Sequence, residues 1–190
     1  MKNITEKIEQ LKKTKRLVLI GIDGPCASGK TTLAAELAEK TGAQIIHADD
    51  FFLPFEMKTP ERLAQAGGNI HYERFVGEVA CGIKSGKPFE YGVYRCSEGM
   101  ISEKKTVIPE GVIIVEGSYS MHPEMQMSYD LTVFVEAPVE LRLKRILERN
   151  GAEKLEIFKS KWIPMEDKYF EKFDIKSKCD IVVNCKGLSH

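Results

Sequence analysis

The chain has 190 residues, and its 28 Lys and Arg side chains balance 28 Asp and Glu side chains, so the formal net charge is zero. A neutral chain lacks the broad positive field that attracts nucleic acid or an anionic membrane, so we expect neither as a partner. Hydrophobic residues make up 43% of the sequence, which excludes disorder and predicts a single domain over residues 1–190. The five cysteines form no C-x-x-C pair, and no apolar run approaches the ~20 residues of a membrane span, so we expect a cytoplasmic protein with reduced thiols.

Five apolar, β-branched runs alternate with helical patterns along the chain. Residues 1–16 have Ile4, Ile8 and Leu11 at helical spacing and predict an N-terminal helix, whose apolar stripe is a candidate interface of a homo-oligomer. The five runs cover residues 17–22, 43–47, 112–115, 131–135 and 181–183. Further helical patterns cover residues 30–40, 72–85, 138–150 and 153–172. Nearly continuous apolar runs are typical of strands buried on both faces, so the pattern predicts an α/β doubly wound domain with a parallel sheet.

Two stretches, residues 54–68 and 86–109, do not fit this alternation because they are rich in Gly, Pro, Lys and aromatic residues. Long connections in compact domains are often lids or binding loops. We therefore expect substrate-binding insertions within residues 50–109 and a lid within residues 142–165.

The clearest motif follows the first apolar run and matches G-x-x-x-x-G-K-[ST]. It predicts a phosphate loop between a strand and a helix, with the alternative of a glycine-rich turn that binds nothing. In such a loop backbone N–H groups and the helix N-terminus hold nucleotide phosphates, Lys30 reaches the β- and γ-phosphates, and the Thr31 hydroxyl binds Mg²⁺. The candidate nucleotide-binding residues are Gly24, Pro25, Cys26, Ala27, Ser28, Gly29, Lys30, Thr31 and Thr32.

Acidic residues follow three of the predicted strands. Ligands of open α/β sheets bind beyond the carboxyl ends of the strands, which directs attention to Asp23, Asp49 and Glu116. A carboxylate near Mg²⁺·ATP holds metal-bound water or accepts a proton from an attacking hydroxyl, and Asp49 and Glu116 are the candidates for these roles. For Asp50 we favour a structural role, as a cap of the following turn.

Three arginines, Arg142, Arg145 and Arg149, share one face of the helix predicted at residues 138–150. A cationic edge can neutralise charge on a transferring phosphoryl group. On spacing alone, a solvated face with weak ion pairs is the favoured alternative.

The chain resembles the uridine kinase family, within a wider group that includes pantothenate kinase and phosphoribulokinase. The resemblance rests on four features in this order: the phosphate loop, Asp49-Asp50-Phe51-Phe52, Glu116-Gly117 and the arginine helix. More narrowly, the chain resembles a bacterial uridine kinase-like branch of the family. The segments that carry this likeness are Gly67 to Phe75, Glu116 to Ser120 and Trp162 to Glu166. The resemblance covers nearly the whole chain and implies a P-loop NTPase fold with strand order 2-3-1-4-5.

The resemblance also implies roles for individual residues. ATP and Mg²⁺ would bind at the phosphate loop, and Asp49 would be the general base that takes the proton from a ribose 5′-hydroxyl. Glu116, with Thr31, would order Mg²⁺, and Asp49 is a further candidate metal ligand. Arg145 and Arg149 would be lid arginines over the phosphates.

The expected acceptor-binding residues are Asp49, Phe51, Tyr72, Glu73, Tyr94 and Arg95. Glu73 stands where the uridine kinases have an Asp that holds the ribose hydroxyls, and Tyr94 matches a Tyr near the base. Arg95 departs from the pattern because the family has an Asp there. For the tyrosines, core packing is an equal alternative to stacking on a base.

These observations favour an ATP-dependent small-molecule kinase acting on uridine, cytidine or a related nucleoside. A second hypothesis changes the acceptor to a pantothenate-like compound or a sugar phosphate, because Arg95 can pair with an acidic substrate. A third hypothesis is a nucleotide-binding regulator that hydrolyses ATP or GTP slowly, although the sequence lacks an Asn-Lys-x-Asp segment for guanine.

Overall fold

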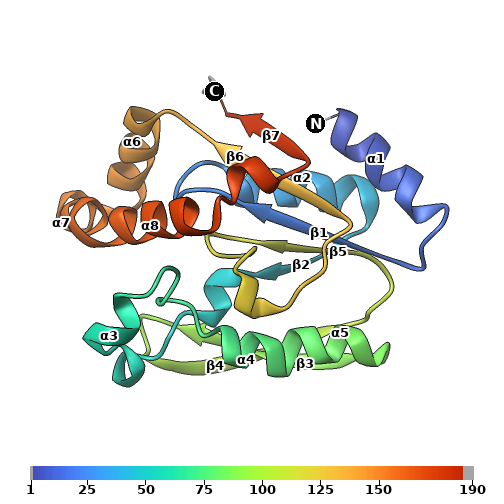
Figure 1. Cartoon of the computed structure of the whole chain (residues 1–190), viewed down its shortest axis with the longest axis horizontal. Helices are drawn as coiled ribbons and strands as arrows, with labels where there is room; N and C mark the ends of the chain where they lie inside the picture. The colour runs from blue at the N-terminus through green and yellow to red at the C-terminus, as the bar shows by residue number, and fades with distance from the viewer. Residues whose placement is uncertain (1, 186–190) are drawn as a thin grey trace.

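The computed structural model describes residues 2–185 and shows an α/β domain built around one parallel sheet (Figure 1). Its strands are β1 (Leu17–Asp23), β2 (Gln44–His47), β5 (Gly111–Glu116), β6 (Leu131–Glu136) and β7 (Ile181–Asn184). They lie in the order β2-β5-β1-β6-β7, and every neighbouring pair is parallel. Counted within this sheet alone, the order is 2-3-1-4-5, so the predicted fold class is confirmed.

The predicted helices form, and two of them contain a π turn. The helices are α1 (Lys2–Lys12), α2 (Lys30–Thr41), α3 (Pro60–Leu63), α4 (Tyr72–Phe75), α5 (Cys81–Ser85), α6 (Val139–Asn150), α7 (Ala152–Ile157) and α8 (Ile163–Phe173). The π turn η3 (Val76–Ala80) joins α4 to α5, and η5 (Phe158–Trp162) joins α7 to α8. Short 3-10 turns are η1 (Ala48–Phe51), η2 (Phe55–Met57), η4 (Pro123–Met125) and η6 (Lys176–Lys178). None of the helices within residues 2–185 is long and apolar enough to cross a membrane.

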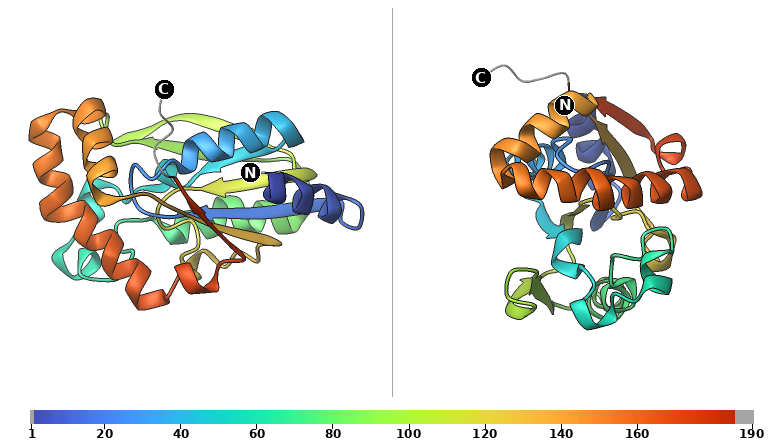
Figure 2. Two further views of the ribbon diagram at one scale, coloured as in Figure 1. Left: turned by 90° about the horizontal axis from the view of Figure 1, so that it is seen from above. Right: turned by 90° about the vertical axis from the view of Figure 1, so that its left-hand side faces the viewer.

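Both faces of the sheet are covered, which explains its nearly continuous apolar strands (Figure 2). In β5, Val112 and Ile114 pack on one face with residues of α1 and α2. The alternate residues Ile113 and Val115 pack on the other face with α8 and the insertion. Because successive side chains of a strand point to opposite faces, each strand contributes to two cores.

The apolar stripe of α1 is not an exposed interface. Ile4 and Ile8 are 1% and 0% exposed and pack in the core with Leu33 and Leu37 of α2. The stripe that the sequence offered as an oligomer interface is therefore used within the chain.

The segment 86–109 is a β-hairpin instead of the long irregular connection that its composition suggested. Strands β3 (Phe89–Arg95) and β4 (Met100–Val107) pair antiparallel and lie below the sheet in Figure 1. Most of β4 is exposed and carries charged residues, so it lacks the apolar run that marked the other strands. The hairpin is held by Tyr91 and Val93 of β3, which are buried in the core of the insertion.

Candidate active site

The predicted phosphate loop connects β1 to α2 at the carboxyl edge of the sheet. Gly24 has φ of 143° and lies so close to β6 that an added Cβ would be 2.1 Å from the Val135 carbonyl oxygen. Gly29 has φ of 107° and precedes α2 without a side-chain cap. An uncapped helix start leaves backbone N–H groups for an anion, so both glycines are needed for the shape of a phosphate site.

Lys30 and Thr31 project from the first turn of α2 toward the end of β5. The Lys30 ammonium donates to the Pro25 carbonyl oxygen at 3.0 Å and to Ser118 Oγ at 3.4 Å. The Thr31 hydroxyl donates to Glu116 Oε1 at 3.1 Å, and His47 Nδ1 lies 2.6 Å from the same oxygen. This hydrogen bond to Glu116 raises the pKa of His47. Residues from three elements thus converge beside the loop.

Two buried polar atoms beside the loop have no partner within residues 2–185. They are Ser28 Oγ and Glu116 Oε2. Buried polar atoms are nearly always hydrogen-bonded, so these two oxygens are candidates to bind a ligand. A carboxylate oxygen next to the Thr31 hydroxyl fits Mg²⁺, which uses one or two protein oxygens plus phosphates and water. The described residues contain no cluster of three or more His, Cys, Asp or Glu side chains that could hold a metal ion.

Asp49 and Asp50 face different surroundings. Asp49 is exposed, and no described group donates a hydrogen bond to its carboxylate. Desolvation by the surrounding protein raises the pKa of Asp49 to about 6, while the charge of Lys30 opposes the rise. Because water still reaches the carboxylate, hydration also limits the rise, and a bound acceptor that displaces this water would strengthen it.

Asp50 is buried, at 7% exposure. Contrary to our expectation, its carboxylate does not cap the following turn. Its Oδ2 accepts hydrogen bonds from Tyr91 at 3.2 Å and Lys105 at 3.0 Å. Asp50 therefore ties the end of β2 to the hairpin, and Asp49 is the carboxylate left open.

Asp23, at the end of β1, organises the same edge of the sheet. Its carboxylate accepts hydrogen bonds from the backbone of Gly24, Tyr119 and Met121 and from the Tyr169 hydroxyl. Burial raises its pKa to about 6 against these hydrogen bonds. Asp23 thus fixes the phosphate loop to the segment after β5 and to α8.

The helices α6 and α8 hold the phosphate loop through Cys26. Arg142 Nε donates to the Cys26 carbonyl oxygen at 2.9 Å, and the Cys26 N–H donates to Glu166 Oε2 at 2.8 Å. Glu166 Oε1 accepts from Ser118 Oγ at 2.9 Å. Both charged side chains are buried, so this network positions the loop from outside its own motif.

The other two arginines of α6 differ from each other. Arg145 donates to the Ala27 carbonyl oxygen at 3.0 Å and so lies at the phosphate loop. Arg149 donates to the neighbouring Asn150 side chain at 2.9 Å, and no hydrogen bond joins it to the loop within the described residues. Thr32 is exposed on the first turn of α2.

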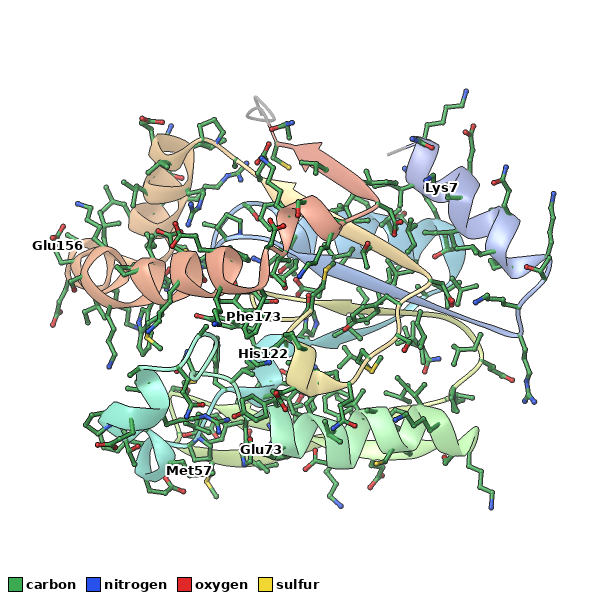
Figure 3. All side chains as sticks on the ribbon, in the orientation of Figure 1. Lys7, Met57, Glu73, His122, Glu156 and Phe173 are labelled. Atoms are coloured by element: carbon green, nitrogen blue, oxygen red, sulfur yellow. The ribbon has the colours of Figure 1, made fainter. Side chains whose placement is uncertain are left out.

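Three of the expected acceptor residues, Phe51, Tyr72 and Glu73, make contacts within the insertion, and Glu73 is labelled in Figure 3. Phe51 is fully buried and stacks on Tyr91, with ring centroids 5.3 Å apart. The Arg62 guanidinium lies 4.0 Å from the ring centroid of Tyr72 and donates to both Glu73 oxygens, at 2.7 and 3.0 Å. Although burial opposes it, this pairing lowers the pKa of Glu73 to about 2.

The two acceptor residues expected on the hairpin, Tyr94 and Arg95, differ in exposure. Tyr94 is 7% exposed and is mostly packed in the fold. Arg95 is exposed and pairs with Glu103 across the hairpin at 3.0 Å. Asp49 is thus the one expected acceptor residue whose polar group is exposed and unpaired among the described residues.

The sequence matches the model of the phosphoribulokinase / uridine kinase family over residues 19–173. The chain belongs to this family. The matched range runs from β1 to the end of α8 and contains the phosphate loop, Asp49, Glu116 and Glu166. Membership establishes a P-loop small-molecule kinase framework and leaves the acceptor open.

Individual relatives differ in their substrates. The chain is 28% identical to the nicotinamide riboside kinase of Eremothecium gossypii, over 92% of this chain and 79% of the relative. It is 26% identical to the uridine kinase of Halobacterium salinarum, over 86% of this chain and 78% of the relative.

Two solved structures share the fold. A possible uridine kinase from Bacillus stearothermophilus superposes with a TM-score of 0.68 at 20% identity, covering 95% of this chain and 99% of that one. A D-glycerate 3-kinase from Cryptococcus neoformans gives a TM-score of 0.65 at 15% identity, covering 95% and 92%. Similar folds thus occur in proteins described as kinases of unlike compounds.

Sequence reasoning missed the supporting residues of this site. Glu166 appeared only as part of a family segment, and His47 and Ser118 only beside candidate carboxylates. A signal existed for Arg142, which shares a helix face with Arg145. No local sequence pattern predicts the contact between Cys26 and Glu166, because the two residues are 140 positions apart.

Proposed function

We propose that the chain transfers the γ-phosphoryl group of Mg²⁺·ATP to a hydroxyl of a small molecule, with Asp49 as the general base. The observation that carries this proposal is the open Asp49 carboxylate, which senses the charges of Lys30 and Glu116 yet has no hydrogen-bond donor of its own among the described residues. A carboxylate in that position can accept a proton next to the transferring group.

The reaction requires one bond to form and one to break. The acceptor oxygen bonds to the γ-phosphorus as its proton moves to Asp49, and the bond from that phosphorus to the bridging oxygen of ADP breaks. Lys30 and Arg145 lie at the phosphate loop, where positive charge stabilises the phosphoryl oxygens. Mg²⁺ would be held by Thr31 and Glu116, with Asp49 as a further candidate, and neutralises phosphate charge when bound.

The first candidate acceptor is the 5′-hydroxyl of uridine, cytidine or a related nucleoside. Relatives described as uridine kinase and nicotinamide riboside kinase support this choice. Tyr72 and Glu73 would need to leave or share their contacts with Arg62 to bind such an acceptor.

The test is ADP release with Mg²⁺·ATP across a panel of nucleosides, pantothenate and sugar phosphates, comparing wild type with Asp49→Asn. Since a general base contributes about 10²–10⁴-fold, acceptor-dependent turnover should fall by that factor in Asp49→Asn, while ATP affinity persists. Loss of ATP binding in Asp49→Asn would assign Asp49 to the metal or to folding. ATP hydrolysis stimulated by a protein partner, with no phosphorylated metabolite, would favour the regulator.

The pH dependence of kcat/KM gives a second test of Asp49. A general base acts in its ionised form, so activity should rise with pH through the pKa of Asp49, about 6. If kcat/KM instead falls on acidification with a midpoint near pH 4, the carboxylate of Asp49 is fully hydrated in the free protein.

A further inference from the structure

The turn that carries the proposed general base is weakly held by its own hydrogen bonds. Asp49 is the second residue of η1, and no side chain caps the start of this turn. At its end, the Phe52 N–H donates to the Asp49 carbonyl oxygen over 3.4 Å, which is long for a hydrogen bond. Turns of the 3-10 type also have poorer hydrogen-bond geometry than α-helices. The direction of the Asp49 carboxylate therefore depends on groups outside η1 that hold its main chain.

Arg74, in α4, holds the residue that follows Asp49. Its Nη2 donates to the Asp50 carbonyl oxygen, and its guanidinium carbon lies 4.2 Å from the ring centroid of Phe51. The Asp50 carboxylate is bound at the same time by two side chains of the hairpin. Because the carbonyl and carboxylate groups of Asp50 are both bound from the insertion, the neighbouring Asp49 has little freedom to turn.

The same guanidinium also binds the hairpin. Its Nη1 donates to the Gly92 carbonyl oxygen at 2.7 Å and to Glu78 Oε2 at 3.1 Å, and the Gly92 N–H donates to this Glu78 oxygen at 2.9 Å. Gly92 belongs to β3, and Glu78 belongs to the π turn η3. Figure 1 shows α4, α5 and the hairpin together below the parallel sheet. Arg74 thus joins η1, β3 and η3 through one side chain.

This set of contacts requires a guanidinium group. Its planar fork presents donors in fixed directions, so Arg74 reaches oxygens of three separate elements at once. A lysine ammonium carries the same charge, but its flexible chain ends in a single nitrogen. The Arg74 side chain is only 12% exposed, so water does not easily replace a contact that is lost.

We propose that Arg74 is a positioning residue for Asp49. By fixing the Asp50 carbonyl group against β3, Arg74 directs the Asp49 carboxylate toward the acceptor hydroxyl. In this role Arg74 acts through η1 and not on the acceptor itself. The inference rests on the proposed kinase function, because it concerns the orientation of its general base.

The kinetics of two variants test the proposal. A catalytic group misplaced by about 1 Å can lose about 10²-fold in rate, so kcat should fall by about 10–10²-fold in Arg74→Met. KM for ATP should stay within about twofold of wild type, because the phosphate loop is unchanged. Arg74→Lys keeps the charge and loses the fork, so its kcat should fall by a similar factor. Wild-type kcat in Arg74→Lys would show that only the charge matters and would overturn the proposal.

A double-mutant cycle with Asp49→Asn separates positioning from a general loss of structure. If Arg74 acts through Asp49, Arg74→Met should change kcat by less than about twofold in the Asp49→Asn background, because no base remains to be oriented. Lys104→Met is the matched control, since Lys104 lies opposite Gly92 on β4 and pairs with the exposed Glu90 at 3.5 Å. Additive losses in the double variant, or an equal loss in Lys104→Met, would overturn the positioning role and leave the kinase function intact. Wild-type turnover in Asp49→Asn would instead refute the general base.

Hydrogen exchange measures the same attachment without catalysis, so it decides the case in which no acceptor is phosphorylated, which itself counts against the kinase proposal. The His71 N–H donates to the carbonyl oxygen of Phe51, the last residue of η1, at 2.8 Å. In Arg74→Met the exchange of this N–H should accelerate about tenfold more than that of the Ile20 N–H in β1, because the opening is local. Equal acceleration at His71 and Ile20, or none at His71, would show that Arg74 does not hold η1 and would overturn the proposal.

Discussion

The donor and acceptor sides of the candidate site are built in opposite ways. On the donor side, Glu116 Oε2 and Ser28 Oγ are buried and lack partners within residues 2–185. On the acceptor side, Arg62 closes on Glu73 and Lys105 closes on Asp50, and the buried atom without a partner in the described residues is an amide oxygen, Asn69 Oδ1. Unpartnered buried atoms mark the place where a ligand completes the hydrogen bonds, whereas paired charges mark groups used by the fold. A charged residue type alone therefore does not predict whether a side chain is free for a ligand, because pairing within the fold decides that.

Lys30→Met should give the largest loss on the donor side. The Lys30 ammonium is held at the phosphate loop by the Pro25 carbonyl oxygen, where its charge would stabilise the transferring phosphoryl group. Removing one stabilising donor of this kind costs about 10²–10³-fold in kcat. Acceptor-dependent ADP release measures the loss, and Arg149→Met, which alters a side chain away from the loop, is the control. Equal losses in both variants would return Arg149 to the site.

Glu116→Gln should raise the Mg²⁺ concentration needed for half-maximal activity by about tenfold or more, because it removes the negative charge beside Thr31. Glu136→Gln is the matched control, since Glu136 ends β6, which is separated from β5 by β1, and pairs with Lys176. Turnover is measured against Mg²⁺ at fixed ATP. An unchanged Mg²⁺ requirement in Glu116→Gln would remove Glu116 from the metal site.

Local sequence was enough to predict the sheet and the loop that connects β1 to α2. The five apolar runs and the phosphate-loop motif are contiguous, so strand positions, Lys30 and Thr31 could be read directly. Family resemblance supplied the strand order. The hairpin was missed because β4 has few apolar residues and is stabilised by long-range contacts such as Lys105 with Asp50, 55 positions apart. The pairing of Glu73 with Arg62 likewise depends on how the insertion folds.

The free energies of unfolding of Asp49 and Asp50 variants test whether each carboxylate is used by the fold. Asp50→Asn weakens hydrogen bonds from Tyr91 and Lys105 at a buried site, so the free energy of unfolding should fall by about 1–3 kcal/mol. Asp49→Asn alters an exposed carboxylate without such partners and should leave stability within about 0.5 kcal/mol of wild type. Urea unfolding of the two variants measures both values. A larger loss of stability in Asp49→Asn would show that Asp49 belongs to the framework.

Glu73→Gln should have the smallest effect and decides between two roles for this residue. Glu73 is about half exposed, so its pair with Arg62 is screened by solvent and should contribute about 0.2–1 kcal/mol to stability. If the pair is structural, a double-mutant cycle with Arg62→Met recovers that coupling energy, and KM for the acceptor stays constant. If Glu73 instead holds ribose hydroxyls, KM for a nucleoside rises about tenfold or more in Glu73→Gln while stability is unchanged. The second result would support a nucleoside as the acceptor, because a free Glu73 carboxylate would then be available for the ribose hydroxyls.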